Sequence, residues 1–292
     1  GPVSSQFVLK DPTVDFAVLE CARGGILKSG LAFQNCDVAV VTNISADHIG
    51  LGGIDTMEQM AKVKSVVPET VFPQGYAILN ADDDLVFAMQ KNLSCNIALF
   101  SMDENNPRIT EHCKKGGYAA VFENGYITIM KGTWKIRVIK VTEVPVTYGG
   151  KALHKIMNCL PAVLSTYFWR NISIEDIRLA LQTFVPSATQ TPGRLNMFQF
   201  KHFQFLVDFA HNPAGLELLC DFVSKLEGEP KVGIISGTGD RRDEDIRELG
   251  RISGKYFDEI IIRQDKNLRG RTAEEIVNLL VEGINETKPK DI

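Results

Sequence analysis

The chain has 292 residues, of which 44% are apolar and 23% are charged, and its formal net charge at pH 7 is −4. These proportions are ordinary for a globular protein with room for two domains. The small negative charge offers no basic surface for nucleic acid or an anionic membrane. No apolar run approaches the ~20 residues that a membrane-spanning helix needs. The six cysteines form no CxxC pair, which argues against a zinc site and favours reduced thiols in a cytoplasmic protein.

The first hundred residues alternate between apolar runs and helical spacing. Strands are predicted at 16–19, 38–41, 76–79 and 97–100, with a helix at 55–67. Unbroken apolar runs of this length are typical of buried parallel strands, so a βαβ arrangement is expected. Between 118 and 148 the apolar period changes to two, and Asn124-Gly125 and Lys131-Gly132 separate three runs. These hairpin signals predict a small antiparallel sheet.

The second half returns to helices and then to a second α/β set. Helices are predicted at 155–170 and 173–184, the latter with Ser173 as N-cap and Asp176 three residues on. Residues 186–193 have linker composition, and strands are predicted at 205–207, 231–235 and 259–262. The predicted domains are therefore 1–194 and 195–292. Because a strand follows the Gly1-Pro2 start closely, and another is expected after residue 286, we expect the chain to be a fragment.

Polar residues follow the predicted strands 16–19 and 38–41 at the point where each ends. Glu20 follows the first strand, and Asn43, Asp47 and His48 follow the second. In open α/β sheets ligands bind outside the carboxyl ends of strands, so Glu20 and His48 are expected to face one crevice. A carboxylate completed by phosphates and water suits Mg²⁺. Taken alone, a glutamate at a strand end is usually only solvated and a histidine there is more often structural, so it is the pairing that favours a magnesium site.

Two lysines lie on the predicted helix that follows. Lys62 is interpreted as an exposed lysine, whereas Lys64 lies in a run with Val63, Val66 and Val67 and is expected to lean toward the cleft. A lysine partly desolvated near a metal deprotonates more readily and reacts as an amine. Carbamylation by carbon dioxide would convert it into an anionic oxygen ligand, although the spacing alone does not show this.

The second α/β set carries polar residues at its strand ends. Asp208, His211 and Asn212 follow its first strand, where they could bind a ribose or orient a nucleotide, although the residues alone favour a turn and a helix cap before the helix that begins near Ala214. Residues 237–243, which include Asp240 and Arg241, follow the next strand and resemble a phosphate or carboxylate loop. Arg194 stands at the predicted domain junction, where it could neutralise charge on a transferring phosphoryl group.

Five short motifs occur in the order found in Mur ligases and folylpolyglutamate synthetases, and the chain resembles that superfamily. The motifs are Val41-Thr42-Asn43-Ile44 through Asp47-His48, Leu79-Asn80-Ala81-Asp82-Asp83, Pro192-Gly193-Arg194, Asp208-Phe209-Ala210-His211-Asn212-Pro213 and Gly239-Asp240-Arg241. Within the superfamily, residues 20–27, 48–53 and 123–127 are most similar to the carboxy-terminal ligase half of the cyanophycin synthetases. The resemblance covers essentially the whole chain.

The resemblance implies a fold and an activity. The fold is α/β: a truncated Mur ligase-like central domain with a small antiparallel sheet, followed by a Rossmann-like C-terminal domain. The implied enzyme is an ATP-dependent amide ligase that forms an acyl phosphate, which an amine attacks through a tetrahedral intermediate. Similarity to the cyanophycin synthetases further implies that arginine is added to the aspartate β-carboxylate of an aspartate-rich primer, while an amino-terminal ATP-grasp module adds the aspartates. A homo-oligomer is expected for the full-length protein.

The resemblance also implies roles for individual residues. Lys64, in the place of the carbamylated lysine, His48 and Arg194 would be catalytic, and Glu20 and His48 would bind Mg²⁺. The ATP contacts would come from Asn43, Asn158, Arg194 and Asp208. The substrates would be held by His211, Asn212, Asp240, Arg241 and Arg269.

Two departures from the family pattern matter. The P-loop is absent, and the nearest string, residues 24–29, lacks the glycine before the lysine. In relatives the P-loop lies upstream of where this chain begins, so truncation is expected to leave the fragment inactive alone. Lys155 and Pro161 also depart from the usual adenine-contacting motif. A scaffold or oligomerisation module that has lost catalysis is the alternative. A metal-dependent hydrolase would need more metal ligands than the sequence offers.

Overall fold

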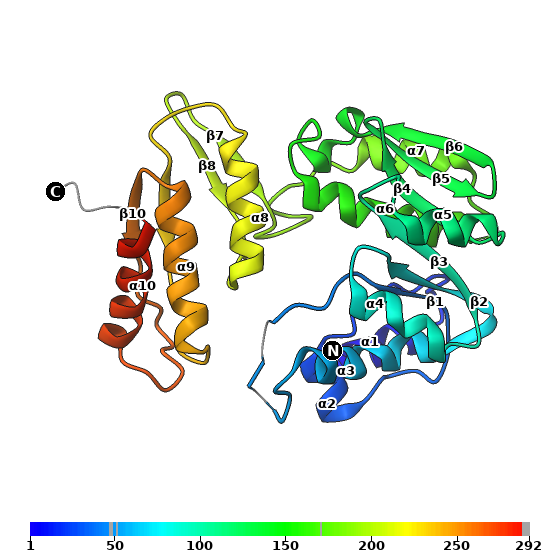
Figure 1. Ribbon diagram of the computed structural model, residues 1–292, viewed down its shortest axis with the longest axis horizontal. Coiled ribbons are helices and arrows are strands. Elements are labelled where there is room, and N and C mark those ends of the chain that lie inside the picture. Colours follow the sequence, from blue (N-terminus) through cyan, green and yellow to red (C-terminus); the bar gives the residue numbers. More distant parts are fainter. Residues whose placement is uncertain (47–48, 51, 170, 288–292) are drawn as a thin grey trace. The chain divides into compact units, whose positions relative to one another are not determined.

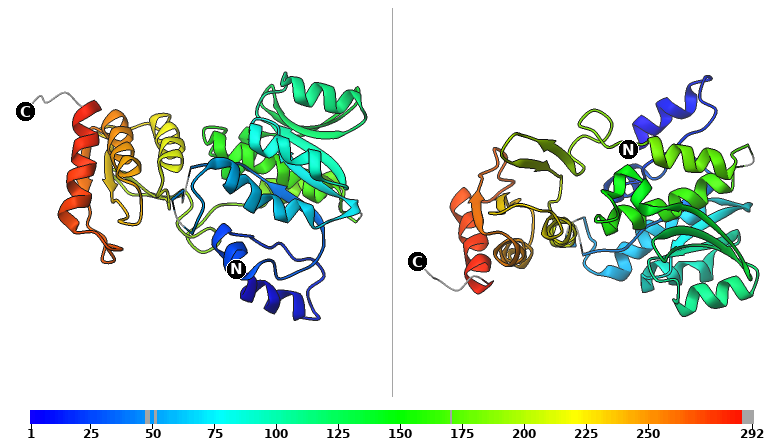
Figure 2. Two further views of the ribbon diagram at one scale, coloured as in Figure 1. Left: turned by 60° about the horizontal axis from the view of Figure 1, so that its bottom comes forward. Right: turned by 90° about the horizontal axis from the view of Figure 1, so that it is seen from above.

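The computed structural model describes residues 1–46, 49–50, 52–169 and 171–287 (Figures 1 and 2). The chain forms two compact units. Unit 1 consists of residues 1–150 and 154–183, and unit 2 consists of residues 151–153 and 184–292. The predicted domain boundary at residue 194 remains a prediction. Within the described residues, no helix is both long enough and apolar enough to cross a membrane.

Unit 1 is built on a six-stranded sheet in the order β1-β2-β3-β4-β5-β6. The first four strands are parallel, and β5 and β6 continue the sheet as antiparallel hairpins. The predicted antiparallel strands are thus present and extend the parallel sheet. All four parallel strands end at the same edge, which brings their following loops together. The strands are β1 Cys36–Val41, β2 Val71–Asn80, β3 Asn96–Ser101, β4 Tyr118–Glu123, β5 Tyr126–Lys131 and β6 Trp134–Lys140.

Helices cover both faces of this sheet (Figure 2). On one face Leu79 and Leu99 pack with α3 Met57–Glu69, α4 Asp84–Ala88 and α5 Pro107–Lys114. On the other face Ile78 and Phe100 pack with α6 Leu153–Tyr167 and α7 Ile174–Thr183. All four side chains are fully buried, because alternate residues of a strand point to opposite faces. Unit 1 also contains α1 Pro2–Lys10, α2 Arg23–Ser29 and the 3₁₀ turns η1 Met89–Asn92, η2 Val141–Glu143 and η3 Pro145–Thr147.

Side-chain caps fix where two of these helices begin. The Gln59 amide donates to the Thr56 hydroxyl at 3.2 Å and the Gln59 side chain accepts from the Thr56 amide, so α3 starts at Met57. The Asp176 amide donates to Ser173 Oγ at 3.1 Å, while Asp176 Oδ2 accepts from the Ser173 amide at 2.9 Å. The predicted N-cap at Ser173 is confirmed. Such reciprocal pairs satisfy amides that a helix leaves unpaired in its first turn.

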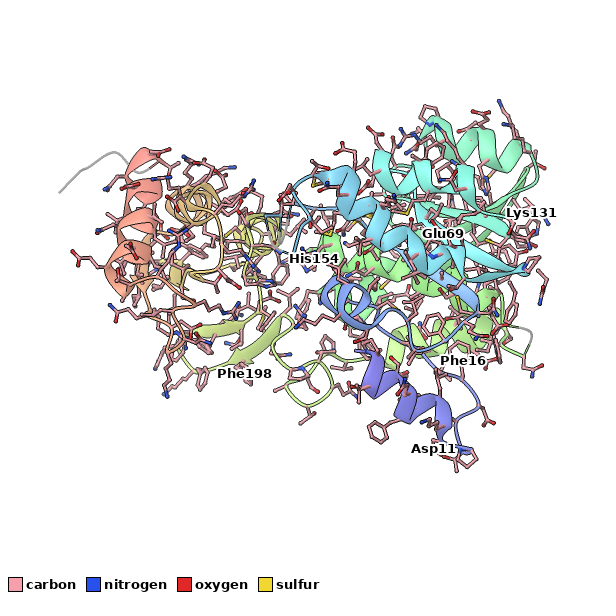
Figure 3. The ribbon with its side chains drawn as sticks, turned by 90° about the horizontal axis from the view of Figure 1, so that it is seen from below. Asp11, Phe16, Glu69, Lys131, His154 and Phe198 are labelled. Atoms are coloured by element: carbon pink, nitrogen blue, oxygen red, sulfur yellow. The ribbon has the colours of Figure 1, made fainter. Side chains whose placement is uncertain are left out.

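The strand predicted at 16–19 is wrong. These residues form no strand, and among the described residues β1 is hydrogen-bonded to β2 alone. Val18 is 85% exposed, and Phe16, labelled in Figure 3, is 53% exposed. The Phe16 and Trp169 rings are nearly perpendicular, with centroids 4.8 Å apart. An apolar run becomes a strand only where a neighbouring strand accepts its backbone hydrogen bonds. The apolar composition of residues 16–19 was therefore not enough to predict a strand.

Unit 2 contains two small sheets. The hairpin of β7 Asn196–Gln199 and β8 Gln204–Val207 is antiparallel, and β9 Val232–Ile235 pairs in parallel with β10 Glu259–Ile262. The predicted strands at 205–207, 231–235 and 259–262 are confirmed. Leu216, Ile246 and Leu280 form the centre of a core shared by α8 Pro213–Ser224, α9 Asp243–Tyr256 and α10 Ala273–Thr287. Figure 3 labels Phe198 on β7, whose side chain is 39% exposed.

Candidate active site

The loop after β1 is held by side chains from the next strand end. Asn80, the last residue of β2, donates from Nδ2 to the Thr42 carbonyl at 2.7 Å. The Ile44 amide donates to Asp83 Oδ2 at 2.7 Å. Asn43 lies between these two anchored residues with an exposed side chain. Asn43, the predicted ATP contact, thus lies at the carboxyl edge of the sheet, between two residues whose backbone is hydrogen-bonded to side chains.

Lys64 reaches the same loop from α3. Its Nζ donates to the Asn43 carbonyl at 3.0 Å, and its side chain is half-buried. Lys62, one helical half-turn away, is exposed. The expected difference between the two lysines is therefore present: Lys64 points to the carboxyl end of β1, and Lys62 points to solvent.

The predicted magnesium pair is only partly visible. Asp47 and His48 lie outside the described residues. Glu20 is exposed and, contrary to the prediction, does not follow a strand; it lines a small pocket with Cys21 and Ala22. The described residues contain no group of three or more histidines, cysteines, aspartates and glutamates able to hold a metal ion. A single exposed carboxylate nevertheless fits Mg²⁺, which takes one or two protein carboxylates and completes its shell with phosphates and water.

Asn158 lies on the exposed side of α6, whose opposite side buries Ile156 and Leu160 in the core. Pro161 is buried inside the same helix and does not end it. Ser165 Oγ donates to the Pro161 carbonyl at 2.7 Å within the continuing helix. The proline that departs from the family pattern is therefore accommodated, and Asn158 remains accessible to a ligand.

In unit 2, Asp208 ties the Arg194 loop to the end of β8. Its Oδ2 accepts from the Leu195 amide and its Oδ1 from the Ala210 amide, both at 2.8 Å. The Arg194 guanidinium carbon lies 5.0 Å from the centre of the Phe209 ring, within the range of a cation–π contact. The structure thus brings Arg194 and Asp208 together. Both carboxylate oxygens of Asp208 already accept a hydrogen bond from a backbone amide. A nucleotide hydroxyl that donates to Asp208 would therefore share one of these oxygens with an amide.

Asn196 also supports this loop, and its role was missed in the sequence. It is 4% exposed, its Oδ1 accepts from the Gly193 amide at 2.7 Å, and its Nδ2 donates to the Thr191 carbonyl at 2.9 Å. The available signal in the sequence was an asparagine just after a Pro-Gly turn. Its burial, which the structure shows, requires hydrogen-bond partners, because buried amides are almost always hydrogen-bonded.

His211 and Asn212 follow Asp208 toward α8. Asn212 Oδ1 accepts from the Gly215 amide at 2.8 Å, which confirms the helix-cap interpretation of this residue. His211 Nδ1 lies 3.0 Å from the Phe209 carbonyl, and the two rings are tilted with centroids 5.1 Å apart. Substrate binding by either residue remains a prediction.

The loops after β9 and β10 interlock around a charged cluster. Arg269 Nη1 donates to Asp240 Oδ2 at 2.8 Å, and Arg241, which is 7% exposed, lies 3.7 Å from Asp240 Oδ1. Burial alone would raise the pKa of Asp240, but the Arg269 hydrogen bond and the charges of both arginines outweigh it, so the pKa is lowered. The three predicted substrate residues are thus adjacent, with an ionised carboxylate between two guanidinium groups.

Arg271, which was not predicted as a site residue, holds this cluster in place. Its Nε donates to the Gly239 carbonyl and its Nη2 to the Arg241 carbonyl, each at 2.9 Å, and Nη2 also lies 2.7 Å from Asp243. A side chain at Gly239 would meet the Leu268 carbonyl oxygen at 2.0 Å, so only glycine allows the loops to approach this closely. The Arg-Gly-Arg run at 269–271 was the available signal.

Family models match both parts of the chain. The Mur ligase middle domain matches residues 3–165, and the glutamate ligase domain of Mur ligases matches residues 193–290. Among curated proteins, the cyanophycin synthetase of Synechocystis sp. is 50% identical over 289 residues, covering 99% of this chain and 33% of that protein. The chain thus spans about a third of the length of this relative.

Two solved structures show the same fold. MurF from Acinetobacter baumannii matches with a TM-score of 0.60 and 20% identity, covering 85% of this chain and 49% of MurF. Escherichia coli FolC in complex with DHPP and ADP matches with a TM-score of 0.58 and 18% identity, covering 84% of this chain and 51% of FolC. The chain therefore belongs to the Mur ligase family, with a middle domain followed by a glutamate ligase domain.

Proposed function

We propose that this chain forms the ligase part of an ATP-dependent carbon–nitrogen ligase that adds arginine to the β-carboxylate of aspartate residues in a poly-aspartate backbone. The observation that carries the proposal is the contact of Lys64 Nζ with the Asn43 carbonyl at 3.0 Å, which places an amine at the carboxyl edge of the sheet. The 50% sequence identity to a cyanophycin synthetase supports the assignment of arginine and poly-aspartate as substrates. The structural likeness to FolC, solved with ADP, supports ATP as the nucleotide.

The proposed reaction has two steps. The γ-phosphoryl group of ATP passes to the substrate carboxylate, which yields an acyl phosphate and ADP. The amine of the incoming amino acid then attacks the acyl carbon, and the tetrahedral intermediate collapses to the amide with loss of phosphate. Mg²⁺, bound through Glu20 and His48, would offset negative charge on the phosphates. Lys64 and Arg194 would position or neutralise the transferring phosphoryl group.

The remaining residues divide into two binding roles. Asn43, Asn158 and Asp208 would contact ATP. Asp240, Arg241 and Arg269 would meet the amino acid, because the ion-paired cluster offers guanidinium donors for a carboxylate and one carboxylate for a basic group. His211 and Asn212 follow Asp208 in unit 2, and they would also contact the substrate.

The test compares Lys64→Ala with Lys62→Ala in the complete protein. ADP release driven by arginine and an aspartate-rich primer is measured for both. Loss of a contact to transition-state charge typically costs about 10²–10³ in rate, so Lys64→Ala should lose that much. Lys62→Ala is the matched control and should keep its activity. If Lys62→Ala is the damaging variant, the assignment of the catalytic lysine is wrong by two positions.

A second experiment tests which substrates are used and whether the chain is instead a scaffold that has lost catalysis. Replacing arginine by lysine, or omitting the primer, should abolish the stimulated ADP release. If none of the wild type, Lys62→Ala and Lys64→Ala proteins releases ADP with any amino acid, the ligase proposal fails and a scaffold that has lost catalysis is the better account.

A further inference from the structure

Three polar contacts converge on the three residues after β1. They are Asn80 Nδ2 to the Thr42 carbonyl at 2.7 Å, Lys64 Nζ to the Asn43 carbonyl at 3.0 Å, and the Ile44 amide to Asp83 Oδ2 at 2.7 Å. Of these three contacts, only the hydrogen bond from Ile44 to Asp83 has a backbone donor. Ile44 is 7% exposed and packs in the core below the sheet edge. Its amide therefore depends on Asp83, since a buried donor without a partner is costly.

Asp83 holds two elements at once. Its Oδ1 accepts from the Leu85 and Val86 amides, both at 3.0 Å, and so caps α4. Its Oδ2 holds Ile44, thirty-nine positions away in the sequence. A carboxylate accepts hydrogen bonds at both oxygens, whereas an asparagine side chain has one oxygen and one amino group. Substitution by the isosteric asparagine can therefore separate capping of α4 from the hydrogen bond to Ile44.

We propose that Asp83 is a positioning residue for the site: through Ile44 it fixes the backbone that carries Asn43 and receives Lys64. Both Asp83 oxygens already accept from backbone amides, which assigns this residue to positioning. The inference rests on the proposed function, in which Asn43 contacts ATP and Lys64 acts at the phosphoryl group. Phosphoryl transfer depends on reacting groups being held in line, so a small shift of this backbone should slow turnover.

The test substitutes Asp83→Asn, which keeps the cap of α4 through Oδ1 and places an amino group against the Ile44 amide. Amide hydrogen exchange at Ile44 should become about tenfold faster, the equivalent of one lost hydrogen bond. In the complete protein, kcat for arginine-dependent ADP release should fall about tenfold or more, with KM for arginine unchanged. If this variant does not fold, Asp83→Ser keeps a hydroxyl for the cap but cannot reach Ile44, and the same results are expected.

Asp82→Asn is the matched control. Its Oδ1 accepts from Ser101 Oγ at 2.5 Å and Asn106 Nδ2 at 2.9 Å, and its Oδ2 accepts from the Met102 amide at 2.8 Å, so the side chain ties the end of β3. Asp82 reaches the loop after β1 through its backbone amide, which donates to Asn80 Oδ1 at 2.8 Å and which Asp82→Asn retains. It should change neither Ile44 exchange nor kcat. Unchanged Ile44 exchange in Asp83→Asn, or an equal loss of kcat in Asp82→Asn, would overturn the proposal. The exchange measurement needs no ligase activity, so it remains decisive if the proposed function fails.

Discussion

The two units are stabilised in different ways. In unit 1 the six-stranded sheet is covered on both faces, and residues such as Ile78, Leu79 and Phe100 are fully buried. In unit 2 the parallel pair β9 and β10 has one face packed on helices, while Ile234 and Ile261 on the other face are 57% and 53% exposed. Parallel sheets normally bury both faces. Unit 1 therefore buries both faces of its sheet, whereas unit 2 buries one face and depends on close packing among α8, α9 and α10.

The same difference extends to the candidate site. The loop after β1 is anchored by Asn80 and Asp83, which stand at the end of a buried strand. The loops of unit 2 are anchored by Asp208 and Arg271, which bond to backbone groups of neighbouring loops. Polar side chains thus anchor both sites: those in unit 1 follow a strand of the buried six-stranded sheet, and those in unit 2 lie in the loops themselves. The following experiments test this contrast.

The largest effect is expected from Phe100→Ala in the core of unit 1. Phe100 is fully buried between the sheet and α6, and removing such a ring costs about 3–5 kcal/mol of unfolding free energy. Hydrogen exchange in each unit measures the loss. Amides of β2 and β3 should lose protection, and those of α9 and α10 should keep theirs. Equal loss in both units would show that their stabilities are not separate.

Gly250→Ala should destabilise unit 2 by a smaller amount. A Cβ at Gly250 in α9 would meet the Leu280 carbonyl oxygen of α10 at 2.2 Å, so the helices must separate. Overpacking of this kind costs about 1–3 kcal/mol, partly offset by the better helix propensity of alanine. Chemical denaturation measures the loss. Gly24→Ala is the control: nothing lies within 4 Å of a Cβ there, and in α2 the change should be neutral or stabilising.

The stability of unit 1 should fall as the pH is lowered below 6.5. Burial in α5 lowers the pKa of His112 from its usual 6.5, and the nearby charge of Lys115 acts in the same direction. Because the folded state binds fewer protons than the unfolded state, stability is fully present above pH 6.5 and declines below it. Thermal melts between pH 7.5 and pH 5 measure this. His112→Gln should flatten the dependence, and an unchanged slope would contradict the assignment.

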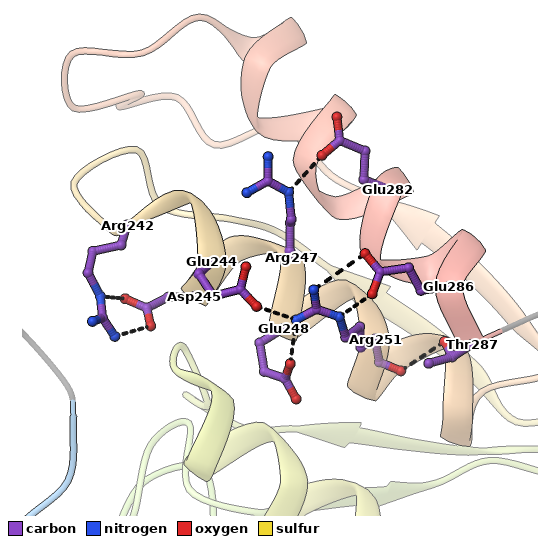
Figure 4. Close-up of polar contacts among 9 residues, drawn as sticks. All are labelled: Arg242, Glu244, Asp245, Arg247, Glu248, Arg251, Glu282, Glu286 and Thr287. Atoms are coloured by element: carbon purple, nitrogen blue, oxygen red, sulfur yellow. Dashed lines mark hydrogen bonds and ion pairs between the residues drawn. The ribbon is translucent and has the colours of Figure 1, made fainter.

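The smallest effect is expected from the ionic network between α9 and α10 (Figure 4). Arg251 contacts Glu244 at 2.6 Å, Glu248 at 2.7 Å and Glu286 at 2.5 Å. Hydrogen bonds to Glu286, Glu248 and Glu244 raise the pKa of Arg251, so it stays charged. Exposed ion pairs contribute little and are screened by salt. Arg251→Met should lower the Tm slightly at low salt and not at high salt; a loss independent of salt would indicate packing instead.

Elements with local causes were predictable from the sequence. The helix cap at Ser173 and Asp176, the hairpin turns at Asn124 and Lys131, and the strand ending at Val41 all follow from neighbouring residues. The different orientations of Lys62 and Lys64 were expected from the sequence, but the valines that suggested them do not mark the buried side of the helix. Val66 is 37% exposed, and the buried residues of α3 are Met60, Ala61 and Pro68. The Mur ligase resemblance was likewise carried by short motifs in order, and the family matches confirm it.

Tertiary structure alone decided which distant groups meet. The apolar run 16–19 lacks a pairing partner in the described chain, so it is not a strand despite its composition. Asp83 looks like a helix cap from its neighbours, and its bond to Ile44 exists only because β1 and β2 are adjacent and parallel. Arg271 reaches Gly239 because β9 and β10 pair. Sequence patterns report local preference, whereas such contacts require two strand ends to be brought to one edge.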